Sequence, residues 1–345
     1  MDFSIEQIEQ YSQINDISLC YGASGICLLL SEIDKEKAVS VFNVLKQKTL
    51  TLHGNVNIRN GLAGVALLVK CLHDKGVFNG KISSVLREID DTIFRAITNN
   101  NVLSQLTIQD AIEVLYYLVI TTKSEEHINL ETNELKFELI RILVDKIFED
   151  ITAEKLADTY IYRIDYLLPQ ILIVLSKVLN LGIYKTRICQ LLKLLEPLIL
   201  YKMPILHSNR LYILVAISKI IESCELLDTW NEYRQLLVEN INKKKIIKIE
   251  CQDLVYFENG LSSIYLLFRE IPEYKSNIKR IGTIISKNID NSTELKRLRE
   301  NENYRKNHVG LFNGICGIEL VLMLIKKDLT YGIKEDNRIN YINFI

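Results

Sequence analysis

The sequence predicts an all-α protein built from repeated helix pairs. Apolar residues recur at three- and four-residue spacing in long segments such as 135–148 and 188–200, which is typical of amphipathic helices. Only 4 Pro and 14 Gly occur in 345 residues, which argues against disorder and against a turn-rich all-β fold. Alternation typical of strands is confined to two short stretches, 14–19 and 245–250. Glycine, finally, is concentrated in one repeated pattern.

That pattern is G-x-x-[GS] followed at once by an apolar helix. Gly or Ser at positions i and i+3 lies on one helix face, which lets the first turn approach a neighbouring backbone closely. Four unrelated helix starts with Gly near the cap are the simpler alternative. The shared Asn or Tyr before the first Gly and the shared apolar tail favour a repeat. The four segments are 20–30, 60–69, 259–268 and 313–322.

The spacing of these segments indicates the number of repeats. Gly22 and Gly61 are 39 residues apart, Gly260 and Gly314 are 54 apart, and 199 residues separate the two pairs. The long interval fits about four steps of 50, so three repeats without the glycines are expected inside it. Seven helix pairs can close into a double ring, with the charged amphipathic helices outside. We expect the inner helices to begin near residues 22, 61, 110, 168, 210, 260 and 314.

Composition and charge exclude several classes of protein. With 42 Lys+Arg against 43 Asp+Glu the net charge is -1, which predicts no nucleic-acid partner and no attraction to an anionic membrane. The acidic start MDFSIEQIEQ lacks the features of a secretory signal, and the longest uncharged run, 17–31, is too short and polar to span a bilayer. Seven scattered Cys without a C-x-x-C pair indicate reduced thiols. We therefore expect a cytoplasmic protein without an integral membrane segment.

The repeated motifs resemble those of the lanthionine synthetase C family, the LanC-like proteins. The nearest matches are Asn-Gly-Leu-Ala-Gly-Val-Ala-Leu-Leu at 60–68 and Phe-Asn-Gly-Ile-Cys-Gly-Ile-Glu-Leu at 312–320. The resemblance covers the chain in order and implies one (α/α) toroid domain of seven helix-pair repeats over residues 1–345. Catalytic members of the family are cytosolic zinc enzymes that add a Cys thiol across dehydroalanine or dehydrobutyrine in a precursor peptide. Zinc lowers the pKa of that thiol, and a His can protonate the resulting enolate.

The positions that carry this chemistry in the family differ here. The family has a Cys-Tyr-Gly-type motif in its fifth repeat, a Cys-His-Gly motif in its sixth and an active-site His in its fourth. The corresponding residues in this chain are His207, Glu258 with Asn259, and Tyr166. The zinc triad and the proton-transfer His are thus missing, and the resemblance implies a degenerate member that needs no zinc cofactor. We still expect the four residues to converge on a central cavity.

Two residues remain candidate metal ligands. Both His207 and Glu258 have side chains that bind zinc, although a catalytic zinc needs three protein ligands. The alternative interpretation is a loop His and a carboxylate favoured by the dipole of a helix start. We expect less than about one zinc per three chains in the purified protein.

The resemblance implies a role in maturing a ribosomally made, lanthipeptide-type precursor beside a dehydratase. In one version the protein is a peptide cyclase that forms thioether rings with unfamiliar residues or by spontaneous thiol addition inside the toroid. In the other it is a pseudoenzyme, a non-catalytic partner that binds the precursor peptide or the dehydratase, and the missing ligands favour this version. The alternative from another class is an α/α-repeat binding module unrelated to peptide maturation.

Overall fold

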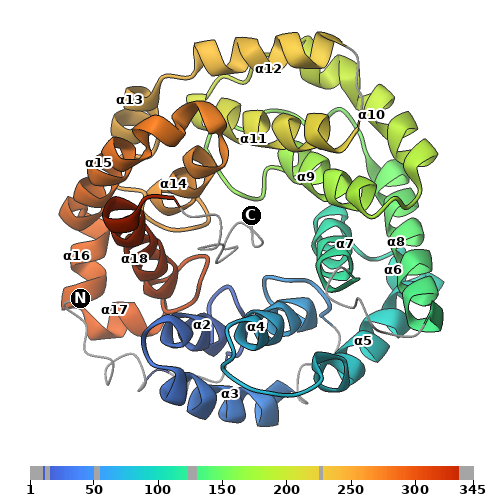
Figure 1. The fold of residues 1–345 in the computed structure, drawn as a ribbon, viewed down its shortest axis with the longest axis horizontal. Coiled ribbons are helices and arrows are strands. Elements are labelled where there is room, and N and C mark those ends of the chain that lie inside the picture. The colour runs from blue at the N-terminus through green and yellow to red at the C-terminus, as the bar shows by residue number, and fades with distance from the viewer. Residues whose placement is uncertain (1–10, 12–15, 50–54, 123–129, 225–227, 334–345) are drawn as a thin grey trace. The chain divides into compact units, whose positions relative to one another are not determined.

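The computed structural model describes residue 11 and residues 16–49, 55–122, 130–224 and 228–333. All regular secondary structure in these residues is helical (Figure 1), which confirms the predicted all-α class. Within them, no helix is both long enough and apolar enough to cross a bilayer. The chain divides into two compact units, which are described separately. Unit 1 comprises Met1–Lys146 and Arg297–Leu320, and unit 2 comprises Ile147–Lys296 and Val321–Ile345. The single domain over residues 1–345 stays a prediction.

Seven largely apolar helices form the cores of these units. Each begins within three residues of an expected start, so the seven predicted helix starts are confirmed. In α2 every residue from Ala23 to Ser31 is buried, because apolar and small side chains surround the helix on all sides. The seven are α2 (Ala23–Ile33), α4 (Leu62–Asp74), α7 (Ile108–Thr122), α9 (Leu167–Asn180), α11 (His207–Ser223), α14 (Leu261–Glu270) and α18 (Ile315–Tyr331).

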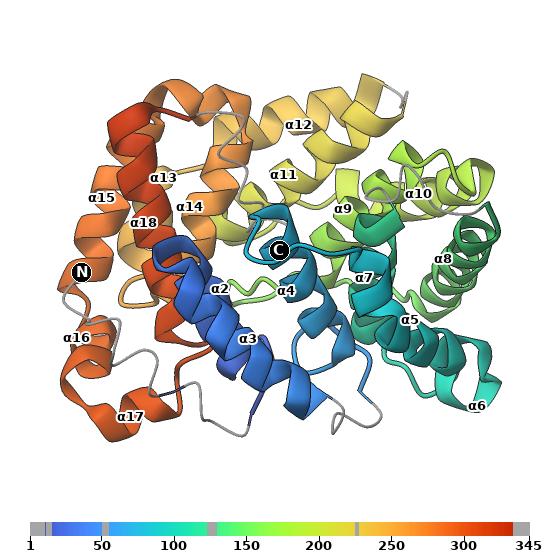
Figure 2. The same ribbon diagram turned by 60° about the horizontal axis from the view of Figure 1, so that its bottom comes forward.

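Amphipathic helices cover the apolar ones. In unit 1, α3 packs against α2 and α5 against α4 (Figure 2), and in unit 2, α12 packs against α11 and α15 against α14. The buried residues of α15 follow three- and four-residue spacing, as in Ile278, Ile281, Ile285 and Ile289. The remaining helices are α3 (Lys35–Thr49), α5 (Ile82–Thr98), α6 (Asn100–Leu103), α8 (Leu130–Asp150), α10 (Lys185–Leu200), α12 (Asp228–Asn240), α13 (Lys243–Lys245), η3 (Pro272–Asn277), α15 (Ile278–Asn291), α16 (Thr293–Glu300) and α17 (Glu302–Lys306).

The segment 245–250 is helical rather than a strand. Residues Ile246–Glu250 form a π-helix, η2, which continues directly from α13. Asn242 caps the N-terminus of α13, because its side chain accepts a hydrogen bond from the main-chain N–H of Lys245. The strand prediction was wrong because alternation over six residues does not distinguish a strand from a short helix whose apolar side chains are half-buried.

Four of the apolar helices begin with the same main-chain hydrogen bond. In each, the residue after the glycine donates its N–H to the carbonyl seven residues earlier, and the loop between them folds back on the helix start. A Cβ on Gly22, Gly61 or Gly260 would lie 2.2, 2.5 or 2.4 Å from the carbonyl oxygen six residues earlier, so only glycine fits. The four bonds are Ala23 to Asp16 (2.9 Å), Leu62 to Asn55 (3.0 Å), Leu261 to Leu254 (2.9 Å) and Ile315 to His308 (2.9 Å).

Two repeats without the glycines replace this bond by side-chain caps. At the start of α7, Thr107 Oγ1 accepts from the Asp110 N–H at 3.1 Å and Asp110 Oδ2 accepts from the Thr107 N–H at 3.3 Å. At the start of α11, the Glu250 carboxylate accepts from the N–H groups of His207 (2.9 Å) and Ser208 (2.8 Å). In both cases carboxylate oxygens satisfy N–H groups that the helix itself leaves without acceptors.

Candidate functional site

Glu258 lies in unit 2, in the loop that leads to α14. Its carboxylate is buried and accepts a hydrogen bond from Arg163 Nη2 at 2.8 Å. Its main-chain carbonyl accepts from the Ile164 N–H at 2.7 Å, so side chain and backbone both tie the α14 loop to the connection between α8 and α9. Arg163 also forms a two-pronged ion pair with Asp165, at 2.9 and 2.8 Å. One guanidinium is therefore shared between two carboxylates, those of Glu258 and Asp165.

Tyr166 lies at the N-cap of α9 and is buried. Burial, and then the negative charge of Asp158, raise the pKa of its phenol. The phenol therefore stays protonated at neutral pH. A group of this kind can donate a hydrogen bond but cannot exchange a proton as the family's His does.

His207 is the first residue of α11, and its ring faces the end of α12. Its Nδ1 lies 3.2 Å from Arg210 Nη1 and accepts the N–H of Asn242 at 3.2 Å; the Asn240 carbonyl is 3.0 Å away. These three contacts hold Nδ1 of the ring at the end of α12. Among the described residues His207 makes no hydrogen bond to Glu258, and the convergence of the four family positions stays a prediction.

Two asparagines bring buried oxygens into the same unit. In the described part of the chain, the side-chain oxygens of Asn259 and Asn209 are buried without a hydrogen-bond partner. The Nδ2 of Asn209 donates to Asp158 Oδ1 at 2.8 Å and to the Thr159 carbonyl at 2.9 Å. Asn209 therefore faces the α8–α9 connection, on the side of α11 away from His207, because residues two apart on a helix point in nearly opposite directions.

The donors at the family's zinc positions do not fit zinc. Glu258 is ion-paired with Arg163, the ring Nδ1 of His207 is hydrogen-bonded, and the amide of Asn259 is not a usual zinc ligand. Among the described residues, no group of three or more His, Cys, Asp or Glu side chains could hold a metal ion. A cationic guanidinium and a second positive ion would also repel each other at this site. No step of the chemistry is therefore assigned to a bound metal.

Cys251 is the cysteine nearest to Glu258 in the sequence, and it is fully buried. Burial, and then the charge of Glu250, raise the pKa of its thiol. Because the thiolate is the reactive form, we expect iodoacetamide at about pH 8 to modify the half-buried Cys189 well before Cys251 in the native protein. Peptide mass mapping after timed labelling measures this order. Equal labelling rates of Cys189 and Cys251 in the folded protein would contradict this prediction.

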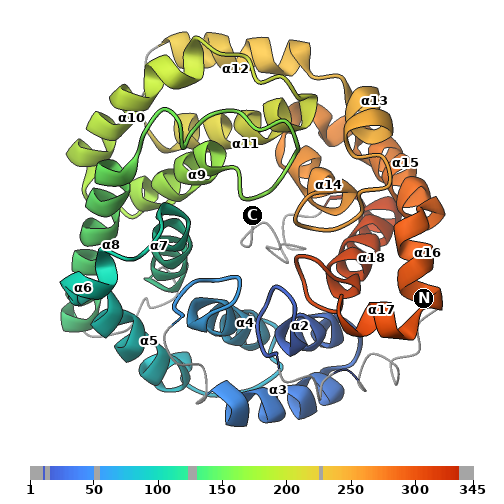
Figure 3. The ribbon, with the colours of Figure 1, turned by 180° about the vertical axis from the view of Figure 1, so that it is seen from behind.

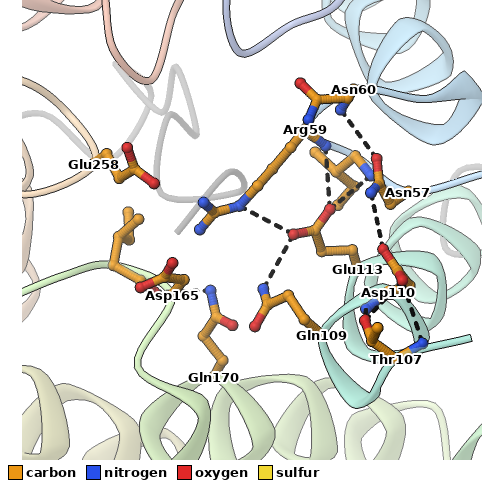
Figure 4. Close-up of polar contacts among 12 residues, drawn as sticks. Asn57, Arg59, Asn60, Thr107, Gln109, Asp110, Glu113, Asp165, Gln170 and Glu258 are labelled. Carbon is orange, nitrogen blue, oxygen red and sulfur yellow. Dashed lines mark hydrogen bonds and ion pairs between the residues drawn. The ribbon is translucent and has the colours of Figure 1, made fainter. Parts of the chain in front are cut away.

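A second polar cluster, which the sequence interpretation missed, lies in unit 1 on α7. The buried carboxylate of Glu113 accepts hydrogen bonds from the Ile58 N–H (2.8 Å), the Arg59 N–H (3.1 Å), Arg59 Nε (3.1 Å) and Gln109 Nε2 (3.0 Å) (Figure 4). Burial raises the pKa of the Glu113 carboxyl, and Arg59 opposes this shift. The cluster fixes the loop before α4 against α7. The sequence feature that could have identified this cluster is the charged Glu113 inside the otherwise apolar segment 111–119.

The neighbouring polar residues extend this contact within unit 1. Asn57 Nδ2 donates to Asp110 Oδ1 at 2.8 Å, and Asn57 Oδ1 accepts the N–H of Asn60 at 2.9 Å. Arg59 also lies over the Phe312 ring, with its guanidinium carbon 5.5 Å from the ring centroid. In unit 2, Gln170 of α9 makes a comparable contact, because its amide donates to the Ile164 carbonyl at 2.8 Å. Helix side chains thus fix loops at helix starts: Glu113 of α7 fixes the loop before α4, and Gln170 fixes the loop before its own helix.

Comparison with solved structures identifies a protein of similar fold. A superposition on nisin cyclase covers 95% of this chain and 93% of that chain, with a TM-score of 0.61 and 14% sequence identity. The fold class is thus the all-α (α/α) toroid that the sequence predicted. Residues 208–341 match the family model described as lanthionine synthetase C-like protein. The matched part of the sequence is thus similar to lanthionine synthetase C-like proteins, and the fold is similar to that of nisin cyclase. No curated protein matches it in sequence.

Proposed function

We propose that this LanC-like protein is a non-catalytic partner in the maturation of a ribosomally made, lanthipeptide-type peptide. It binds the precursor peptide or the dehydratase in the cytoplasm and does not activate peptide thiols. The ion pair between Arg163 and Glu258 is the observation that carries the proposal. The resemblance implies a zinc ligand at the position of Glu258, and the carboxylate there is already paired with a guanidinium.

The chemistry of ring formation supports this interpretation. Addition of a Cys thiol to a dehydrated residue requires a thiolate, a group that holds it and a proton donor for the enolate. Tyr166, with its raised pKa, remains a neutral phenol, and the Nδ1 of His207 is held at the end of α12. These side chains can form hydrogen bonds with a peptide, but neither of them provides a way to lower the pKa of a thiol.

A reconstituted reaction tests the proposal. The precursor peptide and its dehydratase are incubated with and without the protein, and rings are counted by mass spectrometry after alkylation of the remaining thiols. We expect the protein to retain the peptide or the dehydratase on an affinity resin, and ring formation to proceed at the spontaneous rate. Glu258→Gln and His207→Ala should leave that rate unchanged, because neither side chain activates a thiol.

The controls separate the alternatives. Glu138→Gln changes an exposed glutamate of α8 that forms an ion pair with Arg141. This variant therefore measures the effect of losing one surface charge. Ring formation that depends on the protein and falls with Glu258→Gln, but not with Glu138→Gln, would identify a cyclase. Retention of neither the peptide nor the dehydratase would instead favour a binding module unrelated to peptide maturation.

A further inference from the structure

A short basic helix in unit 2 has exposed lysines. Residues Lys244, Lys245 and Lys248 lie on α13 and η2, and their side chains are exposed. Among the described residues, none of these three lysines forms an ion pair with a carboxylate. The preceding Lys243 is engaged differently, with its Nζ 4.8 Å from the centroid of the Tyr274 ring. Three like charges within six residues create a positive potential that favours an anionic partner.

Large apolar side chains are exposed on three segments that contact the start of α11. Ile249 of η2 directly follows Lys248, and Tyr160, Ile161 and Ile205 lie in the loops before α9 and α11. Their exposed fractions range from 61% for Ile205 to 83% for Tyr160, which is high for apolar residues of this size. An exposed apolar group next to polar residues is typical of a surface that binds another molecule.

Hydrogen bonds hold these segments around the start of α11. The Ile205 N–H donates to Asp158 Oδ2 at 2.7 Å, and Asn209 donates to the Thr159 carbonyl, which fixes the loop that carries Tyr160. On the other side, Glu250 of η2 accepts from His207. Figure 3 shows the α8–α9 connection crossing near the start of α11, with α13 beyond it. We call the exposed side chains of this region the α11 collar: Tyr160, Ile161, Ile205, Lys244, Lys245, Lys248 and Ile249.

We propose that the α11 collar binds an acidic peptide segment that also carries apolar side chains. The lysines offer salt bridges to carboxylates, and the isoleucines and Tyr160 offer contact area to apolar side chains on the same segment. An anionic membrane fits the chemistry less well, because the whole chain has a net charge of -1 and gives no long-range attraction to a bilayer. The proposal adds a binding surface and does not depend on the role of Glu258.

Fluorescence anisotropy with a synthetic peptide tests the proposal. The probe is a labelled peptide in which Glu alternates with Leu and Phe, and a Lys-containing peptide of the same pattern is its charge-reversed counterpart. The variants are Lys244→Glu/Lys245→Glu/Lys248→Glu for the charges and Tyr160→Ser/Ile161→Ser/Ile205→Ser for the apolar part. We expect each to weaken binding of the acidic peptide at least about tenfold, and added salt to weaken binding to the wild type.

A matched control keeps the net charge change constant. The triple variant Lys275→Glu/Lys279→Glu/Lys287→Glu alters exposed lysines of η3 and α15, elsewhere in unit 2, and should bind the peptide within about twofold of the wild type. Circular dichroism confirms that each variant is folded. Equal weakening by the control and collar variants would overturn the proposal. Unchanged binding of the acidic peptide by either collar variant would also overturn it, as would equal binding of the acidic and the Lys-containing peptides. Binding to phosphatidylserine vesicles without binding to the acidic peptide would overturn it in favour of a membrane surface.

Discussion

Replacing Gly64 by alanine is expected to lower the free energy of unfolding by about 3 kcal/mol, as for severe overpacking of a core. A Cβ at this position would lie 1.9 Å from the carbonyl oxygen of Ile58 and 2.9 Å from its carbonyl carbon. Main-chain atoms held in a loop cannot move aside as the end of a flexible side chain can. The first turn of α4 would therefore have to separate from the loop that precedes it.

Urea unfolding followed by circular dichroism measures the effect. Gly80→Ala is the matched control, because a Cβ on Gly80 would meet nothing within 4 Å. Its unfolding free energy should stay within about 0.5 kcal/mol of the wild type. Equal unfolding midpoints for Gly64→Ala and Gly80→Ala would show that the close approach at α4 does not exist.

Replacing Glu113 by alanine is expected to destabilise the protein by about 3–5 kcal/mol, the range found when one partner of a buried ion pair is removed. The change removes the acceptor of two main-chain N–H groups, of Ile58 and of Arg59, together with the counter-charge of the Arg59 side chain. The unfolding free energy of Glu113→Gln should lie between those of the wild type and Glu113→Ala. The glutamine amide keeps one oxygen acceptor, but its nitrogen would face N–H donors that now bond to the second carboxylate oxygen.

The exposed ion pair of Glu138 and Arg141 in the same unit provides the control for Glu113. Both side chains are about half exposed, so Glu138→Gln should change the unfolding free energy by less than about 1 kcal/mol. Hydrogen exchange adds a local measurement, since loss of Glu113 should reduce protection of the Ile58 and Arg59 amides first. An unfolding free energy for Glu113→Ala close to that of Glu138→Gln would rule out a stabilising role for the cluster.

The sequence predicted the helix starts because their determinants are local. At α2, α4, α14 and α18 the glycine and the carbonyl that it approaches are only a few residues apart, so a short pattern contains both. The start of α11 was placed three residues late, near residue 210 rather than at His207. Its cap is Glu250, which comes from a different helix pair, and no window around residue 207 contains that signal.

The candidate site was less accessible to sequence reasoning for the same reason. The family positions Tyr166, His207, Glu258 and Asn259 could be named by order of repeats, but their partners could not. Arg163 is 95 residues from Glu258, and Glu113 is 54 residues from Arg59. Pairs so far apart in sequence depend on how the helices pack. The pattern of apolar and polar residues along a single sequence does not predict them.

The main-chain hydrogen bond at the starts of α2, α4, α14 and α18 makes the fold there independent of the reactive side chains in the preceding loops. Because the bond joins backbone atoms, it makes no demand on the side chains of the intervening loop beyond the glycine. One of those loops also holds Glu258 and Asn259, the positions at which the resemblance implies metal ligands. Substitution of loop side chains other than the glycine therefore leaves this backbone bond in place. A fold that begins its helices in this way tolerates wide sequence differences, and the 14% identity with nisin cyclase over 95% of the chain is consistent with that tolerance.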